Sequence, residues 1–316
     1  MFYLEKVIAV TQDAMCRAET EVLGKKLQED GIDFVCMTVE EYVGRAQAPW
    51  EIGACLWMTD CGAVADRLRA DGQAVLAVLH EENRNQDLTA ALYACEQPNE
   101  LDADYMDKVF RRYLGLPWEI LETERCTVRE TVPEDADEFF GIYSAPGMTL
   151  YNDGLSPELE QERQYIQDYI DKVYRFYNFG VWTILKKDTD EVIGRAGFSF
   201  REGFEGPELG YVIGRPWQGQ GYATEVCRAI LEYGFEELGF EEVHAFVRPE
   251  NEASLRLCRK LGMNCKETWG AECRERYDAN SGDGCMELCE ENGQPAYRGI
   301  VEIGGREYMR WSVTTT

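Results

Sequence analysis

The chain has 316 residues, of which 45% are hydrophobic and 29% charged, and its formal net charge at pH 7 is −27. The length allows two domains with separate cores, and the hydrophobic content excludes a disordered chain. No apolar run approaches the ~20 residues that span a bilayer, and we expect no secretory leader at the first residues. Such a negative charge repels nucleic acid and anionic membranes and favours cationic ligands such as amines.

The 12 cysteines are scattered along the chain, and several lie within apolar runs, such as the one at 33–39. This pattern is typical of buried, reduced thiols, so we expect a cytoplasmic protein. Structural zinc sites favour closely spaced pairs of cysteines. Among Cys265, Cys273, Cys285 and Cys289, only the last two have that spacing. We therefore expect free thiols and no metal.

Residues 1–115 alternate short apolar runs with amphipathic stretches. Apolar runs without internal alternation, separated by helices, predict a parallel sheet covered on both faces, which is a Rossmann-like α/β domain. The expected strands are 6–12, 33–39, 53–60 and 74–80, and the expected helices are 18–31, 61–72 and 102–115. Residues 116–124 are expected to form a linker to a second domain at 125–316.

The second domain begins with an alternating strand at 125–131 and a helix at 132–144. A longer helix at 156–177 is expected to be capped by Ser156, with Pro157 at its first position. Its predicted inner face follows helical spacing and comprises Ile166, Tyr169, Ile170, Val173, Tyr174 and Tyr177. The remaining predicted elements are a hairpin at 181–200, strands at 208–214 and 241–249, helices from Tyr222 and at 251–262, and a hairpin at 299–313 turning on Gly304 and Gly305.

Gly219 and Gly221 lie one residue apart between a predicted strand and a predicted helix. The free N–H groups of a helix start and the absence of Cβ atoms suit a phosphate group. The Walker pattern is absent, and a dinucleotide fingerprint would need a glycine at Thr224 and an acid where the next strand ends in Arg248. The diphosphate of coenzyme A and a glycine-rich turn without a ligand both remain open.

Three segments in this order resemble the GNAT acetyltransferases, in particular the branch that includes ribosomal-protein N-terminal acetyltransferases. They are RCTVRETVPEDADEFFGIY (125–143), ELGYVIGRPWQGQGYATEV (208–226) and VRPENEASLRLCRKLGM (247–263). The resemblance implies an α+β mixed-sheet domain that transfers the acetyl group of acetyl-CoA to a primary amine of a small molecule or a protein N-terminus. It implies cofactor contacts at Tyr211, Val212, Ile213, Gln218, Gly219, Gln220, Gly221, Tyr222, Ala223, Asn251 and Ser254.

The resemblance also implies catalytic roles. Glu208 matches a glutamate that acts as general base on the acceptor amine, and its alternative interpretation is an exposed acid at a strand start. Many relatives place a tyrosine acid where this chain has Cys258, so Ser254 is the candidate that protonates the thiolate. The leading glutamine or arginine of the phosphate loop is replaced by Pro216. A non-catalytic acyl-CoA sensor or scaffold with the same fold is the alternative.

The first domain faintly resembles the later part of a haloacid-dehalogenase-like domain over 59–80. That family's D-x-D nucleophile is absent, because the first strand ends in Thr11, Gln12 and Asp13. We therefore disfavour a phosphatase and expect a non-catalytic domain that serves acceptor recognition, regulation or a homodimer contact. His80 ends a strand where α/β sheets bind ligands, but the sequence shows no partner for it. His244, within a strand, is expected to be a packing residue.

Overall fold

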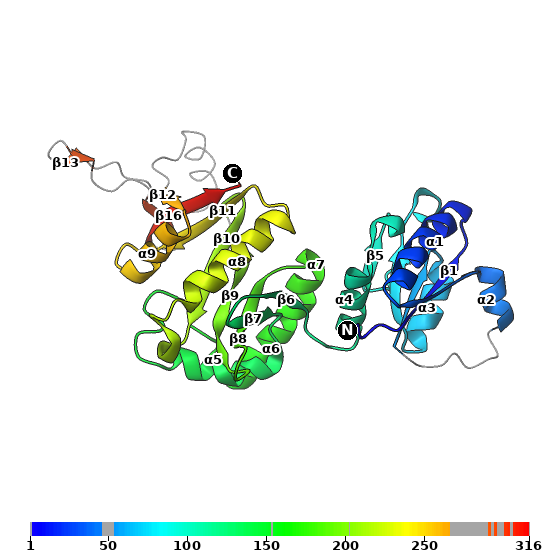
Figure 1. Ribbon diagram of the computed structural model, residues 1–316, viewed down its shortest axis with the longest axis horizontal. Helices are drawn as coiled ribbons and strands as arrows, with labels where there is room; N and C mark the ends of the chain where they lie inside the picture. The colour runs from blue at the N-terminus through cyan, green and yellow to red at the C-terminus, as the bar shows by residue number, and fades with distance from the viewer. Residues whose placement is uncertain are drawn as a thin grey trace. The chain divides into compact units, whose positions relative to one another are not determined.

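The computed structural model describes residues 2–45, 54–152, 154–201, 203–265, 290–291, 294–295, 300–303 and 306–315. The chain divides into two compact units, Met1–Trp118 and Glu119–Thr316 (Figure 1). Among the described helices, none is both long and apolar enough to cross a membrane.

The first unit is built on five parallel strands in the order β2-β1-β3-β4-β5. Apolar side chains alternate between its two faces, where α1 and α4 cover one cluster and α2 and α3 cover the other. The strands are β1 (Lys6–Thr11), β2 (Asp33–Thr38), β3 (Cys55–Thr59), β4 (Ala74–Val78) and β5 (Tyr93–Cys95), and the helices are α1 (Ala14–Glu29), α2 (Val39–Arg45), α3 (Gly62–Ala70) and α4 (Ala103–Tyr113).

The predicted parallel sheet is therefore confirmed. The fifth strand and α2 were not predicted, because they have only three and seven residues and carry little periodicity. The narrower resemblance to a haloacid-dehalogenase-like domain stays a prediction.

The second unit contains a mixed sheet in the order β12-β16-β11-β10-β9-β8-β7-β6, with β15 paired to β16. Only β10 and β11 run parallel among these described strands. The strands are β6 (Glu119–Glu122), β7 (Cys126–Arg129), β8 (Val181–Lys186), β9 (Val192–Phe200), β10 (Pro207–Ile213), β11 (Glu242–Val247), β12 (Asn264–Cys265), β15 (Ile300–Ile303) and β16 (Arg306–Thr314), and a separate pair is formed by β13 (Glu290–Glu291) and β14 (Gln294–Pro295).

Helices pack against the sheet of the second unit. α5 and α6 share a buried cluster with β9 and β10, whereas α8 lies against Phe198 through Gly234, and α9 packs on β11 and β16. The helices are α5 (Ala136–Tyr143), α6 (Leu159–Tyr169), α7 (Arg175–Tyr177), α8 (Tyr222–Glu236) and α9 (Glu252–Lys260). The predicted hairpins at 181–200 and 299–313 are present as the pairs β8/β9 and β15/β16, and Gly304 and Gly305 lie outside the described residues.

The long helix predicted at 156–177 is divided. α6 begins at Leu159 with Glu158 as its N-cap, so the predicted cap at Ser156 is wrong. Ser156 instead donates its backbone N–H to the Glu162 carboxylate at 2.8 Å. A π-helical turn, Ile170–Tyr174, then interrupts the α-helical spacing. Because a π turn adds one residue per turn, the predicted inner face ends at the buried Tyr174, and Tyr177 is 43% exposed.

The predicted linker also differs from the structure, since residues 119–122 form β6 and pair with β7. Ile120 is buried within β6, which explains why this short run joins the sheet. His244 is 2% exposed within β11 and contacts Arg310, in agreement with a packing role.

Candidate active site

The two parallel strands at the centre of the second unit separate from one another. Across their fully described lengths, β10 and β11 pair at a single position, Glu208 with His244. Beyond it, residues 209–212 of β10 and 245–248 at the end of β11 line one pocket of about 420 Å³. Backbone groups on the facing edges of separated strands are free to bind a ligand in an extended conformation.

A second pocket of about 410 Å³ lies at the glycine-rich loop and the start of α8. The two pockets share lining residues, so the loop and the gap between the strands open onto each other. The shared residues are Tyr151, Asn152, Tyr211, Val212, Asn251, Ser254 and Leu257.

The loop itself requires its glycines. Gly219 and Gly221 have φ values of +74° and +89°, in the left-handed region that side chains disfavour. Gly221 is the N-cap of α8, and a Cβ there would lie 3.4 Å from an Arg125 nitrogen. The loop therefore presents backbone N–H groups and the positive end of the helix dipole to the second pocket, an arrangement that suits a diphosphate.

Arg125, the residue directly before β7, holds this loop. Its Nε donates to the Glu225 carboxylate at 2.7 Å, and its Nη1 donates to the Gln220 carbonyl at 3.1 Å. The guanidinium also stacks on the Tyr222 ring, 4.1 Å from the centroid. Pro216 occupies the position of the missing basic side chain, and the neighbouring Arg215 donates to the Pro146 carbonyl. Support for the loop thus comes from a distant segment of the chain.

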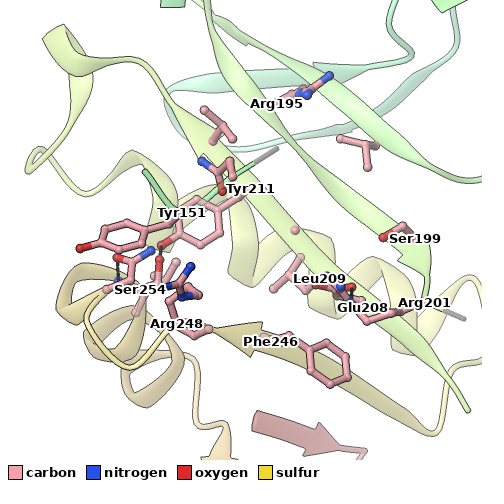
Figure 2. A pocket seen from close by; sticks show the side chains of 18 of the residues that line it. Tyr151, Arg195, Ser199, Arg201, Glu208, Leu209, Tyr211, Phe246, Arg248 and Ser254 are labelled. Atoms are coloured by element: carbon pink, nitrogen blue, oxygen red, sulfur yellow. Dashed lines mark hydrogen bonds and ion pairs between the residues drawn. The ribbon is translucent and has the colours of Figure 1, made fainter. Parts of the chain in front are cut away.

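Tyr211 and Ser254 meet where the two pockets join (Figure 2). The phenol and hydroxyl oxygens are 2.8 Å apart, and Asn251 caps α9 by accepting the Ser254 backbone N–H at 3.2 Å. Burial raises the pKa of Tyr211, and the hydrogen bond to Ser254 opposes that rise only in part. Tyr211 is therefore protonated at neutral pH. Cys258 nearby is buried, which raises the pKa of its thiol to about 12.

Glu208 lies in the first pocket and not at an exposed strand start. Its side chain is 13% exposed, and Arg201 donates to both carboxylate oxygens at 2.7 and 2.8 Å. Successive side chains of a strand point to opposite faces, so Glu208 and Tyr211 approach the gap from opposite faces of β10. The arrangement places a carboxylate and a pair of hydroxyl donors on either side of the same cavity.

Most of the predicted cofactor residues line the two pockets. Gln220 is the exception, because it is absent from both linings and its side chain donates to the Pro216 carbonyl at 2.6 Å. Tyr165 and Tyr169 of α6 line the first pocket, whereas Tyr174 is fully buried.

The sequence interpretation missed three arginines that line the first pocket: Arg195, Arg201 and Arg248. Arg195 donates to the Tyr143 hydroxyl at 2.9 Å and stacks on that ring. Arg248 lies 3.5 Å from Glu250. The available signal was the charge of Arg195 within the mostly apolar strand β9, where a polar side chain needs a partner or a ligand.

Comparison with known proteins agrees with this geometry. Residues 125–264 match the model of the GNAT acetyltransferase domain. An N-acetyltransferase of Bacillus licheniformis designated p20 is 36% identical over 148 residues, which are 46% of this chain and 82% of that protein. The ribosomal protein uS5-alanine N-acetyltransferase of Escherichia coli (strain K12) is 36% identical over 78 residues, which are 24% of this chain and 40% of that protein.

Among solved structures, a GNAT-family acetyltransferase from Bacillus anthracis aligns with a TM-score of 0.44 and 19% identity, over 61% of this chain and 97% of that one. The fold and the matched residues define an acetyltransferase. The chain belongs to the GNAT acetyltransferase family. The first unit lies outside the match to the family model.

Proposed function

We propose that this enzyme transfers the acetyl group of acetyl-CoA directly to a primary amine. The observation that carries the proposal is the junction of the two pockets at Tyr211 and Ser254. The loop pocket suits the diphosphate of the co-substrate, and the gap between β10 and β11 suits its extended arm. Acetyl transfer then takes place in the first pocket, between Glu208 on one face of β10 and Tyr211 on the other.

The residues can be assigned to the proton transfers that this reaction needs. The attacking amine must be neutral, and Glu208 accepts its proton directly or through a water molecule. Arg201 orients Glu208 by its paired hydrogen bonds. A backbone N–H of β10 stabilises the oxyanion of the tetrahedral intermediate. When the carbon–sulfur bond breaks, Ser254 donates a proton to the departing thiolate and takes one from the Tyr211 hydroxyl through the hydrogen bond they share. Tyr211 regains its proton from solvent, and Glu208 releases the amine proton to solvent, so the cycle closes without net loss.

The charge of the first pocket favours a particular class of acceptor. The net charge of the chain predicts a cationic acceptor, yet the described residues that line this pocket include three arginines and a single carboxylate. Arg201 is paired with Glu208, whereas Arg195 has no carboxylate at ion-pairing distance among the described residues. Arg195 and Glu208 lie on the same face of the sheet, because Arg195 pairs with Val212 and an even number of positions separates Val212 from Glu208 along β10. An acceptor that carries a carboxylate or phosphate beside its amine fits this arrangement.

The test is calorimetric titration with acetyl-CoA, followed by an acceptor screen that detects released thiol. In the variant Gly221→Glu, the new carboxylate should repel the diphosphate and abolish binding. The control is Gly239→Glu, because Gly239 also has a positive φ of +67° but lines neither pocket. Loss of binding in Gly221→Glu alone supports the cofactor site. Binding by the wild type without acetylation of any amine would favour the acyl-CoA sensor instead.

A further inference from the structure

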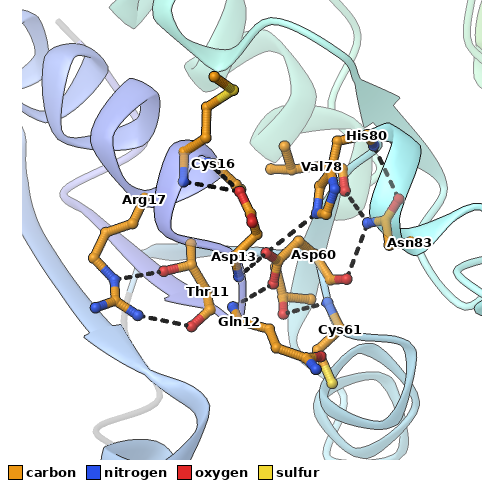
Figure 3. Close-up of polar contacts among 12 residues, drawn as sticks. Thr11, Gln12, Asp13, Cys16, Arg17, Asp60, Cys61, Val78, His80 and Asn83 are labelled. Carbon is orange, nitrogen blue, oxygen red and sulfur yellow. Dashed lines mark hydrogen bonds and ion pairs between the residues drawn. The ribbon is translucent and has the colours of Figure 1, made fainter.

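The first unit carries a polar cluster at the carboxyl ends of its strands. From β1 the chain moves to β2 on one side and then crosses to β3 on the other side. In open α/β sheets, ligands bind in the crevice where the connections leave in opposite directions. Side chains from the start of α1 and from the segments after β3 and β4 meet at this point (Figure 3).

Three of these side chains can share one metal ion. They are Cys16 in the first turn of α1, Asp60 directly after β3 and His80 after β4. A sulfur, a carboxylate oxygen and a ring nitrogen of these residues all lie within 4.8 Å of one another. Cys16 and Asp60 are 3% and 1% exposed, so two of the three side chains are screened from water.

His80 supplies an independent observation. Its Nε2 is buried and has no hydrogen-bond partner in the described part of the chain, although the Asp60 carboxylate lies 3.4 Å away. A buried polar atom without a partner is costly, and a metal ion bound at this nitrogen removes the cost. The sequence alone did not reveal that Asp60 lies beside His80.

The surrounding hydrogen bonds hold the candidate ligands in place. The Asp60 carboxylate accepts the backbone N–H groups of Gln12 at 2.7 Å and Asp13 at 2.9 Å. Asn83 accepts the His80 backbone N–H at 2.9 Å and donates to the Asp60 carbonyl at 3.0 Å. Such outer contacts fix the direction of ligating side chains in metal sites.

We infer that Cys16, Asp60 and His80 bind a zinc ion. One sulfur, one nitrogen and one oxygen ligand suit zinc, whereas magnesium and calcium prefer oxygen alone. Neighbouring nitrogen and oxygen ligands of tetrahedral zinc lie about 3.3 Å apart, a value that the His80–Asp60 distance already approaches. Binding releases the thiol proton of Cys16 to solvent, and a water molecule completes the fourth position.

The experiment uses the full chain after treatment with a chelator. Cobalt(II) serves as the spectroscopic probe, and zinc affinity is measured by competition against cobalt. We expect one equivalent of cobalt, tetrahedral d–d absorption and a thiolate-to-cobalt charge-transfer band. Cys16→Ser should abolish that band, and both Cys16→Ser and His80→Gln should weaken binding by more than about 100-fold, which exceeds the loss expected from changing an outer contact.

The matched control is Cys61→Ser, since Cys61 follows Asp60 directly and is similarly buried but is not one of the three candidate ligands. It should retain the band and the affinity. If Cys16→Ser does not fold, His80→Gln decides, because His80 is partly exposed. No cobalt binding, or binding that neither variant weakens, overturns the inference and leaves the cluster as a purely structural contact.

Discussion

In the second unit, β10 and β11 separate to open a cavity, whereas in the first unit the strands stay paired and the crevice arises from the order of the connections. The candidate active site draws its loop and its capping residue from short contiguous segments, around Gly221 and Asn251. The proposed zinc site draws Cys16, Asp60 and His80 from three distant ones. Contiguous segments can be recognised in a sequence, and a site assembled across a sheet cannot. The following changes sharpen or break this contrast.

The largest effect is expected for Glu208→Gln. The amide keeps the size of the side chain but cannot accept a proton, so kcat/KM should fall by about 10²–10⁴-fold. Acetyl-CoA affinity, measured by calorimetry, should stay unchanged because Glu208 lies outside the loop pocket. A variant with near wild-type turnover would show that another group removes the amine proton.

Tyr211→Phe and Ser254→Ala test the proposed proton donor. Each should lower kcat by about 10–100-fold, and the double variant should cost little more than either single change, because residues that act as a unit are not additive. The measurement is a double-mutant cycle in kcat at saturating acetyl-CoA. Cys258→Ala is the control, since its buried thiol makes no part of this relay. Additive losses would argue against a relay.

Arg195→Met tests the class of acceptor. Loss of a hydrogen bond to a charged group costs about 1.5–3 kcal/mol, so KM for a carboxylate-bearing amine should rise at least about tenfold. The corresponding amide-bearing amine should be unaffected, and the comparison uses matched pairs of acceptors that differ only in this group. An equal change for both members of a pair would assign Arg195 to packing against Tyr143.

The smallest effect concerns the support of the loop. Burial acts to raise the pKa of Glu225, but hydrogen bonds from Thr123 and Arg125 outweigh it and hold the pKa below its ordinary value of 4.5. The stabilisation is therefore present above pH 4.5 and is lost as the pH falls through the lower folded-state value. The difference in Tm between the wild type and Glu225→Gln should disappear on acidification.

Glu232→Gln is the matched control for this measurement, because Glu232 is an exposed carboxylate on the same helix. The difference in Tm between the wild type and Glu232→Gln should be small and should not change on acidification. A Tm difference for Glu225→Gln that persists at low pH would mean that the substitution acts through packing and not through the ion pair with Arg125.

Local patterns in the sequence predicted the loop glycines, the helix at 251–262 and most of the strands, because these depend on backbone conformation and on neighbours a few residues away. Tyr177 was wrongly placed inside, since a π turn at Ile170–Tyr174 shifts the helical face. The role of Tyr211 as a partner of Ser254 was also missed, because 43 residues separate them in the chain.

By itself, the sequence determined a parallel α/β unit followed by a mixed-sheet unit with a glycine-rich loop before a helix, since periodicity and glycine positions are local properties. Only the tertiary structure decided that Arg125 supports this loop, that arginines line the first pocket of an acidic protein, and that Cys16, Asp60 and His80 meet. These contacts depend on strand order and register, which bring distant residues together and leave no periodic trace along the chain.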